Sequence, residues 1–143
     1  MKLELTPDEF KKLIELAYLG EWMINSQHDP EFQDEAADAA LQRLLAARKL
    51  PEIDRDEETG NYFMESDWTD RLYEDHILDY DDHVFWDELA ERLAIRDLAR
   101  QRGIEAEQLD RDEDARHLRP IEDHYHREFE HNGLDRLDLT SDF

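Results

Sequence analysis

Negative charge is the property that most limits what this chain can fold into. The 143 residues include 40 Asp and Glu but only 17 Lys and Arg, which gives a formal net charge of -23. Carboxylates at this density repel one another and destabilise a compact state. Folding is nevertheless favoured, because the apolar residues cluster at helical spacing and all three Trp lie inside such clusters. With four Gly and no Cys, the chain is predicted to be a helical polyanion without disulfides or thiolate chemistry.

The apolar spacing predicts a mainly α fold, with four to five helices in one bundle-like domain that covers residues 1–143. The clearest helix start is Thr6-Pro7-Asp8-Glu9, where the threonine caps the helix, the proline suits its first turn and the glutamate completes a capping box. A second helix is expected to begin at Asp29-Pro30 by the same reasoning. The helices are expected over about residues 6–24, 29–50, 66–79 and 82–103, with a break at 79–82, and a last helix is expected to run from near Arg111 or Pro120 to Asn132.

Four further structural points follow from local composition. Gly20 lies in the apolar middle of the first helix, where glycine costs about 1 kcal/mol relative to alanine; a neighbouring backbone that approaches closely there would be a reason to keep it. Because that helix is apolar on more than one side, a homodimer that buries part of the first two helices is also expected. A minor antiparallel β element is predicted as a hairpin near 52–64, as paired terminal strands at 2–5 and 136–140, or both. The inward stripe of the fourth helix is expected to be Phe85, Trp86, Leu89, Leu93 and Leu98.

Several classes of function receive no support from the sequence. No apolar run approaches the ~18 residues that span a bilayer, and the first residues lack the apolar core of a signal peptide. A surface of this charge would be repelled by DNA and by anionic lipid headgroups. No Gly-rich phosphate loop or Gly-x-Ser-x-Gly nucleophile motif occurs. We therefore expect a cytoplasmic, non-catalytic protein without a cofactor, which binds neither nucleic acid directly nor membranes.

The strongest candidate for a binding surface is the middle of the chain. Residues 52–91 carry 16 acids and two bases, together with half of all the aromatic side chains. Aromatic anchors inside an acidic rim are typical of a surface that docks a basic partner. The sequence therefore predicts an interaction or regulatory protein that docks a basic protein surface through residues 52–91. The residues expected to make this contact are Asp67, Asp70, Tyr73, Glu74, Asp75, Asp79, Tyr80, Asp81 and Asp82.

Three other interpretations of the acidity stay open. It can serve solubility alone, as in proteins of a salt-loaded cytoplasm. Rows of carboxylates can also mimic duplex DNA, which presents one charge per ~1.7 Å of axis, and so inhibit a nucleic-acid-binding protein. The third interpretation is a metal-binding helical protein, because Glu-x-x-His spacing of the kind used in di-iron bundles occurs near the end of the sequence. Its candidate ligands are His117, His124, Glu128 and His131.

A calcium loop is a weaker candidate. Residues 54–65 have oxygen-bearing side chains at the first, third, fifth and twelfth positions, as an EF-hand loop requires. The sixth position, where the sharp turn needs glycine, is Thr59. The favoured interpretation of this segment is therefore a solvated hairpin tip.

Overall fold

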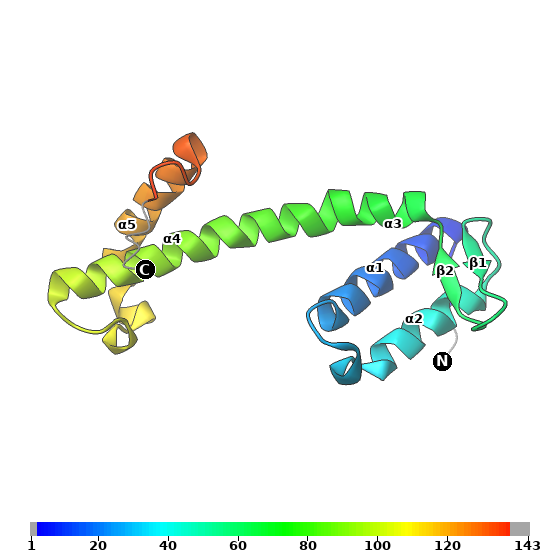
Figure 1. Cartoon of the computed structure of the whole chain (residues 1–143). Helices are drawn as coiled ribbons and strands as arrows, with labels where there is room; N and C mark the ends of the chain where they lie inside the picture. The colour runs from blue at the N-terminus through cyan, green and yellow to red at the C-terminus, as the bar shows by residue number, and fades with distance from the viewer. Residues whose placement is uncertain (1–2, 138–143) are drawn as a thin grey trace. The chain divides into compact units, whose positions relative to one another are not determined.

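The computed structural model describes residues 3–137 of the chain. It is mainly α-helical with one antiparallel β-hairpin in the described part, which confirms the predicted fold class (Figure 1). Packing of the backbone divides the chain into two compact units, Met1–Asp79 and Tyr80–Phe143. The expectation that residues 1–143 form one domain stays a prediction.

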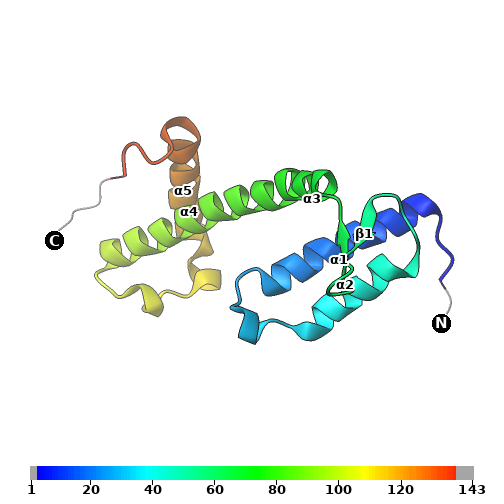
Figure 2. The same ribbon diagram turned by 45° about the vertical axis from the view of Figure 1, so that its right-hand side comes forward.

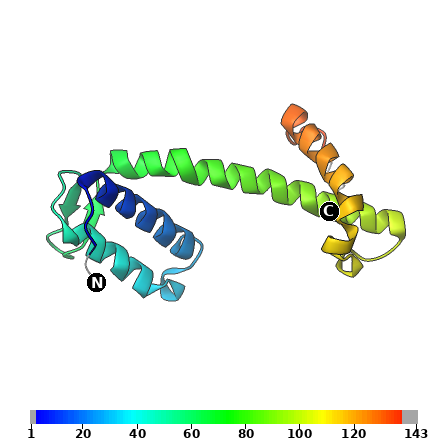
Figure 3. The same cartoon turned by 180° about the vertical axis from the view of Figure 1, so that it is seen from behind.

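The first unit is a pair of helices closed at one end by the β-hairpin, with the two helices side by side (Figure 1, Figure 3). Strands β1 and β2 pair antiparallel, with Ile53 opposite Met64. This hairpin lies within the predicted range of 52–64. The elements in chain order are α1 (Pro7–Asn25), the 3-10 turn η1 (Pro30–Phe32), α2 (Glu35–Ala47), β1 (Ile53–Arg55), β2 (Tyr62–Met64), α3 (Ser66–Leu72) and the π-helical segment η2 (Tyr73–Leu78).

Helix α1 begins where the sequence predicts. The Glu9 amide donates to Thr6 Oγ1 at 3.3 Å, and the Thr6 amide donates to Glu9 Oε2 at 2.8 Å, so the capping box is complete. These bonds occupy amide donors that would otherwise lack partners in the first turn. The backbone and hydroxyl donors of Thr6 also lower the pKa of the Glu9 carboxyl.

The predicted start of the second helix is wrong. Pro30 opens only the short turn η1, and α2 begins five residues later, at Glu35. The buried Asn25 side chain explains the difference, because it accepts from the Asp34 amide at 2.7 Å and donates to the Asp34 carbonyl at 3.3 Å. Asp34, held in place at the end of α1, then caps α2 by accepting from the amides of Ala36 and Ala37.

No neighbouring backbone approaches Gly20 closely in the described part of the chain. Among the described residues, no atom outside its own helix backbone and chain neighbours lies within 4 Å of a Cβ built on Gly20. The reason is that Gly20 lies on the exposed side of α1, next to the exposed side chains of Leu16 and Met23. The homodimer expected from the apolar sides of this helix stays a prediction.

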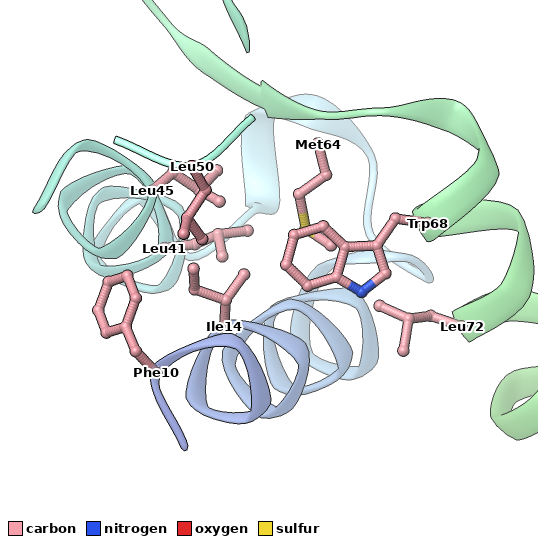
Figure 4. Close-up of a cluster of buried hydrophobic side chains, with 8 residues drawn as sticks. All are labelled: Phe10, Ile14, Leu41, Leu45, Leu50, Met64, Trp68 and Leu72. Carbon is pink, nitrogen blue, oxygen red and sulfur yellow. The ribbon is translucent and has the colours of Figure 1, made fainter. Parts of the chain in front are cut away.

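The core of the first unit joins α1, α2, the hairpin and α3 (Figure 4). The indole ring of Trp68 lies over α1 beside Met64, and its Nε1 donates to Glu15 Oε1 at 3.0 Å. On the other side of the core, the Gln42 side chain bonds both the amide and the carbonyl of Tyr62, which fixes β2 against α2. The buried side chains are Phe10, Ile14, Leu41, Leu45, Leu50, Met64, Trp68 and Leu72.

The helical segment 66–78 keeps one side buried because part of it, η2, is a wider π-helical turn. Trp68, Leu72 and Ile77 are all buried, and their spacing is four residues and then five. A regular α-helix repeats every 3.6 residues, so a five-residue step turns the later side chain away from the earlier one. The π-helical turn of η2 accommodates the extra residue and keeps Ile77 inside. The expected break at 79–82 is absent, because the change in phase is taken up earlier, within η2.

The second unit consists of α4 (Asp79–Arg102), the 3-10 turn η3 (Ala106–Gln108) and α5 (Arg111–Asn132), and α5 crosses α4 (Figure 2, Figure 3). Ala90 and Ala94 are fully buried and allow close packing of α4. Phe129 packs against Ala90, and Leu118 packs against Ala94. Helix α5 begins at Arg111, the earlier of its two predicted starts, and Pro120 lies within it.

The structure differs from two sequence expectations, the inward position of Phe85 and the pairing of the terminal strands. Phe85, expected on the inward stripe of α4, is 49% exposed, because α5 covers the face that carries Ala90 and Ala94 instead. The terminal strands are not formed by residues 3–5 or by 136–137. Residues 2 and 138–140, the rest of that proposed pair, lie outside the described part of the chain.

Candidate functional site

The nine residues predicted to contact a basic partner are all exposed. Asp67 and Asp70 lie on α3. Tyr73, Glu74 and Asp75 lie on η2. The remaining four, residues 79–82, form the first turn of α4. We use the name acidic surface for the first-unit members of this group, Asp67, Asp70, Tyr73, Glu74, Asp75 and Asp79, together with Leu78.

The acidic surface is exposed because of the way its own helix packs. Trp68 and Leu72 belong to the core of the first unit and Ile77 is buried too, so most of the intervening positions of α3 and η2 face solvent. Leu78 is as apolar as Ile77, yet its side chain is 45% exposed. The π-helical turn causes this difference, because it buries the Ile77 side chain and leaves the Leu78 side chain facing solvent. The five-residue gap between Leu72 and Ile77 is the one sequence signal that indicates this register.

The carboxylates of the acidic surface are not compensated by nearby bases. Within residues 3–137, no ion pair joins Asp67, Asp70, Glu74, Asp75 or Asp79 to a basic side chain. Arg71 is the only Lys or Arg between residues 66 and 82, and its Nε donates to the Asp67 backbone carbonyl at 3.0 Å. The surface therefore concentrates negative charge.

Exposed rings accompany these carboxylates. Tyr73 is 44% exposed and Tyr80, in the first turn of α4, is 51% exposed. Further along α4, the Trp86 indole donates to Asp82 Oδ1 at 3.0 Å. This carboxylate of the predicted contact set is therefore already hydrogen-bonded to an aromatic side chain of its own helix. Exposed tyrosine offers a flat ring face and a hydroxyl, which suits contact with guanidinium and ammonium groups.

Carboxylates inside the first unit have local partners instead. Burial raises the pKa of Glu15, but hydrogen bonds from Lys12 and Trp68 outweigh it, so the pKa of this carboxyl is lowered. Glu52 accepts from Lys11 Nζ at 2.5 Å, and this bond lowers its pKa. The first pair lies within α1, the second links α1 to the residue before β1, and neither is part of the acidic surface.

The metal candidates do not form a ligand set. His124, Glu128 and His131 line one open hollow of about 350 Å³, but Arg127 and Arg136 line it too and would repel a cation. Nδ1 of His131 lies 2.7 Å from the Arg127 carbonyl oxygen, and Glu128 accepts from Asn132 at 2.9 Å.

His117 lies elsewhere, with its ring nitrogen 3.4 Å from Arg102 Nη2. In the described part of the chain, no group of three or more His, Cys, Asp or Glu side chains is arranged to hold a metal. The geometry therefore gives the metal interpretation no support.

The candidate calcium loop is a closed hairpin tip. Asp56 Oδ1 accepts from the amides of Glu58 at 2.7 Å and Thr59 at 3.4 Å, and these donors lower its pKa. Gly60 adopts a φ of 78°, the left-handed conformation that glycine tolerates. Because the Asp56 oxygen caps the turn, the segment matches the solvated hairpin tip that the sequence favours.

A polar contact between α4 and α5 escaped the sequence analysis. Tyr125 donates its hydroxyl hydrogen to Asp97, which also accepts from Arg96 Nε at 2.8 Å. Burial raises the pKa of Asp97, but the bonds from Arg96 and Tyr125 outweigh it and lower that pKa. Burial and the Asp97 carboxylate raise the pKa of Tyr125. The lowered pKa makes Asp97 a weak base, and the raised pKa makes Tyr125 a weak nucleophile, so the pair does not suggest catalysis. Its hydrogen bond links α4 to α5. The two residues are 28 apart in sequence, and no local pattern indicates their contact.

No described helix has the combination of length and apolar character needed to cross a bilayer. No protein family, curated protein or solved structure matches this chain. The candidate site therefore depends on the geometry of its own residues.

Proposed function

We propose that this protein is a non-catalytic, cytoplasmic interaction protein that docks a basic protein through residues 52–91, with the acidic surface as the centre of contact. The observation that carries the proposal is the combination of unpaired carboxylates with exposed Tyr73 and Leu78 on the same segment. A solvated face that serves only solubility needs the carboxylates but not the exposed apolar side chains. A docking surface uses both.

The chemistry of the surface indicates which groups the partner presents. Carboxylates bind Lys and Arg through charge-assisted hydrogen bonds, and the Tyr73 ring adds a cation–π contact worth ~0.5–1 kcal/mol at an exposed site. Attraction between exposed charges is screened over ~10 Å at 0.1 M salt. We therefore expect the complex to form at low ionic strength and to dissociate as salt is added.

The test is affinity capture on the immobilised full chain, followed by quantitative mass spectrometry at low and high salt. The diagnostic variant combines Glu74→Gln, Asp75→Asn and Asp79→Asn. Its matched control combines Glu31→Gln, Glu107→Gln and Glu130→Gln, which removes the same three charges from exposed positions elsewhere. We expect one basic protein to be retained by the wild type and the control, released by high salt, and lost from the diagnostic variant.

Equal loss from the diagnostic and control variants would mean that net charge alone drives capture, and the proposal would fail. It would also fail if a polyanion of scrambled sequence retained the same protein. If the retained protein is displaced by duplex DNA, the docking acts as nucleic-acid mimicry and the proposal stands in that sharper form.

A further inference from the structure

Helix α4 carries an exposed stripe on the side that α5 does not cover. We name it the outer stripe: Asp81, Phe85, Glu88, Arg92 and Arg96, all of them exposed. The spacing of four, three, four and four residues places these side chains on one face of the helix. The opposite face packs on α5 through Ala90, Leu93 and Ala94. Within the described residues, Arg96 donates to the Tyr125 hydroxyl of α5 at 3.1 Å, and no hydrogen bond, ion pair or ring contact joins the other four side chains of the outer stripe to α5.

The outer stripe is complementary to its own reverse except at its centre, where the two Glu88 side chains meet and each keeps its ion pair with Arg92 of its own helix at 3.0 Å. In chain order it reads acid, aromatic, acid, Arg, Arg. When a second α4 runs antiparallel with the two-fold axis between residues 88 and 89, Asp81 lies opposite Arg96 of the second copy. In the same register, Phe85 lies opposite Arg92. Each contact occurs twice, as a closed two-fold interface requires.

The charge along the whole helix supports this direction of pairing. Residues 79–91 contain six acids and no Lys or Arg, whereas residues 92–102 contain four Arg and one acid. Antiparallel pairing sets the acidic half of one helix against the Arg-rich half of the other, and parallel pairing would set like charges together. Phe85 is the apolar anchor of the contact, because its ring is half-exposed and, among the described residues, meets only one other ring, that of Trp86, edge-on.

The residues of the stripe are available for such a contact. Arg92 bonds Glu88 of the same helix at 3.0 Å, yet its side chain is 75% exposed, so its guanidinium face can lie against a ring. Arg96 is held by Asp97 and by the Tyr125 hydroxyl at 3.1 Å, which fixes its position before association. Neither ion pair has to break for the two helices to meet.

We propose that the outer stripe is a homodimer interface, through which α4 pairs antiparallel with α4 of a second copy. One pair of helices buries less than the ~1,200 Å² of a standard interface, and two chains of this charge repel at long range. The dimer is therefore weak and concentration-dependent. This inference does not rest on the basic-partner proposal, and either can fail without the other.

The chain has no Cys, so single cysteines can report the register directly. Glu88→Cys lies beside the proposed axis and is expected to form disulfide-linked dimers. A mixture of Phe85→Cys and Arg92→Cys proteins is expected to cross-link, whereas each alone is not. Gln101→Cys, exposed on the same helix but far from the axis, is the matched control and is expected to stay monomeric.

Sedimentation of the wild-type chain over a wide concentration range completes the test. We expect the mass to rise from 17.2 kDa toward twice that value. Phe85→Ala is expected to weaken dimerisation roughly 5- to 30-fold, because symmetry removes two cation–π contacts. A monomer at every concentration would overturn the proposal. Cross-linking of Gln101→Cys as fast as Glu88→Cys, or of Phe85→Cys alone as fast as the mixture, would overturn it too.

Discussion

Replacing Ile77 by alanine tests the register of the π-helical turn. Ile77 is 4% exposed, whereas its neighbour Leu78 is 45% exposed. Truncation of a buried isoleucine to alanine costs ~2–5 kcal/mol, part from lost transfer energy and part from the cavity left behind. Truncation at an exposed position is usually within ~0.5 kcal/mol. We therefore expect Ile77→Ala to lower the free energy of unfolding by about 2–4 kcal/mol and Leu78→Ala to leave it nearly unchanged.

The contrast depends on the extra residue in η2. In a continuous α-helix, Ile77 would follow Leu72 by five residues, or about 500° of rotation, and the two side chains would lie about 140° apart. Ile77 would then leave the core and its truncation would cost little. The π-helical turn is what gives Ile77 a large predicted effect.

The assay is equilibrium urea unfolding, followed by circular dichroism and by Trp fluorescence. Because the chain has two compact units, coincidence of the two signals has to be checked before one free energy is assigned. Similar losses for Ile77→Ala and Leu78→Ala, or a larger loss for Leu78→Ala, would refute the π-helical register and the exposure of Leu78 that the acidic surface requires.

Three further predictions concern stability. Gly20→Ala should stabilise the chain by about 0.5–1 kcal/mol in the same urea assay, because the site is open and helical; a loss would reveal a contact there. Asn25→Ala should destabilise by ~1–3 kcal/mol, since it leaves the Asp34 amide without its partner, and an unchanged midpoint would contradict this. Asp97 has a lowered folded pKa, so its stabilising effect is present above its unfolded pKa of ~3.9 and is lost as the pH falls through the folded pKa. The stability difference between the wild type and Asp97→Asn should therefore shrink on acidification below about pH 4, and a difference that persists at lower pH would contradict the assignment.

The features that the sequence predicts correctly are those set by neighbours in the chain. The Thr6 capping box involves residues three apart, and the hairpin tip closes through Asp56 and its next three residues. Helix α5 likewise starts at a local cap, where Asp110 accepts from the amides of Asp112 and Glu113. In each case one short segment contains both the donor and the acceptor.

The errors arise where a distant side chain decides between two local signals. Both Asp29-Pro30 and Asp34 are good helix starts, and the buried Asn25 selects the second by bonding the Asp34 backbone. Packing also buries Ile77 and leaves Leu78 exposed, a choice on which the local pattern makes no prediction. The direction from which α5 packs on α4 leaves Phe85 outside and Ala90 inside. These outcomes depend on tertiary packing, which a single sequence does not encode in its local pattern.

Exposed carboxylates alone do not distinguish a docking surface from a solubility device, because every fold of this sequence must leave most of its acids in water. The exposed apolar side chains do distinguish them. A combined Tyr73→Ser and Leu78→Ser variant keeps the full charge and removes only apolar contact area, so it should raise solubility or leave it unchanged if the surface serves solvation. If the surface docks a basic protein, the same variant should lose a large part of the retained partner in the capture assay, while the helical circular dichroism stays that of the wild type. Undiminished capture would mean that the Tyr73 and Leu78 side chains contribute nothing, and the charge would then be the whole basis of binding.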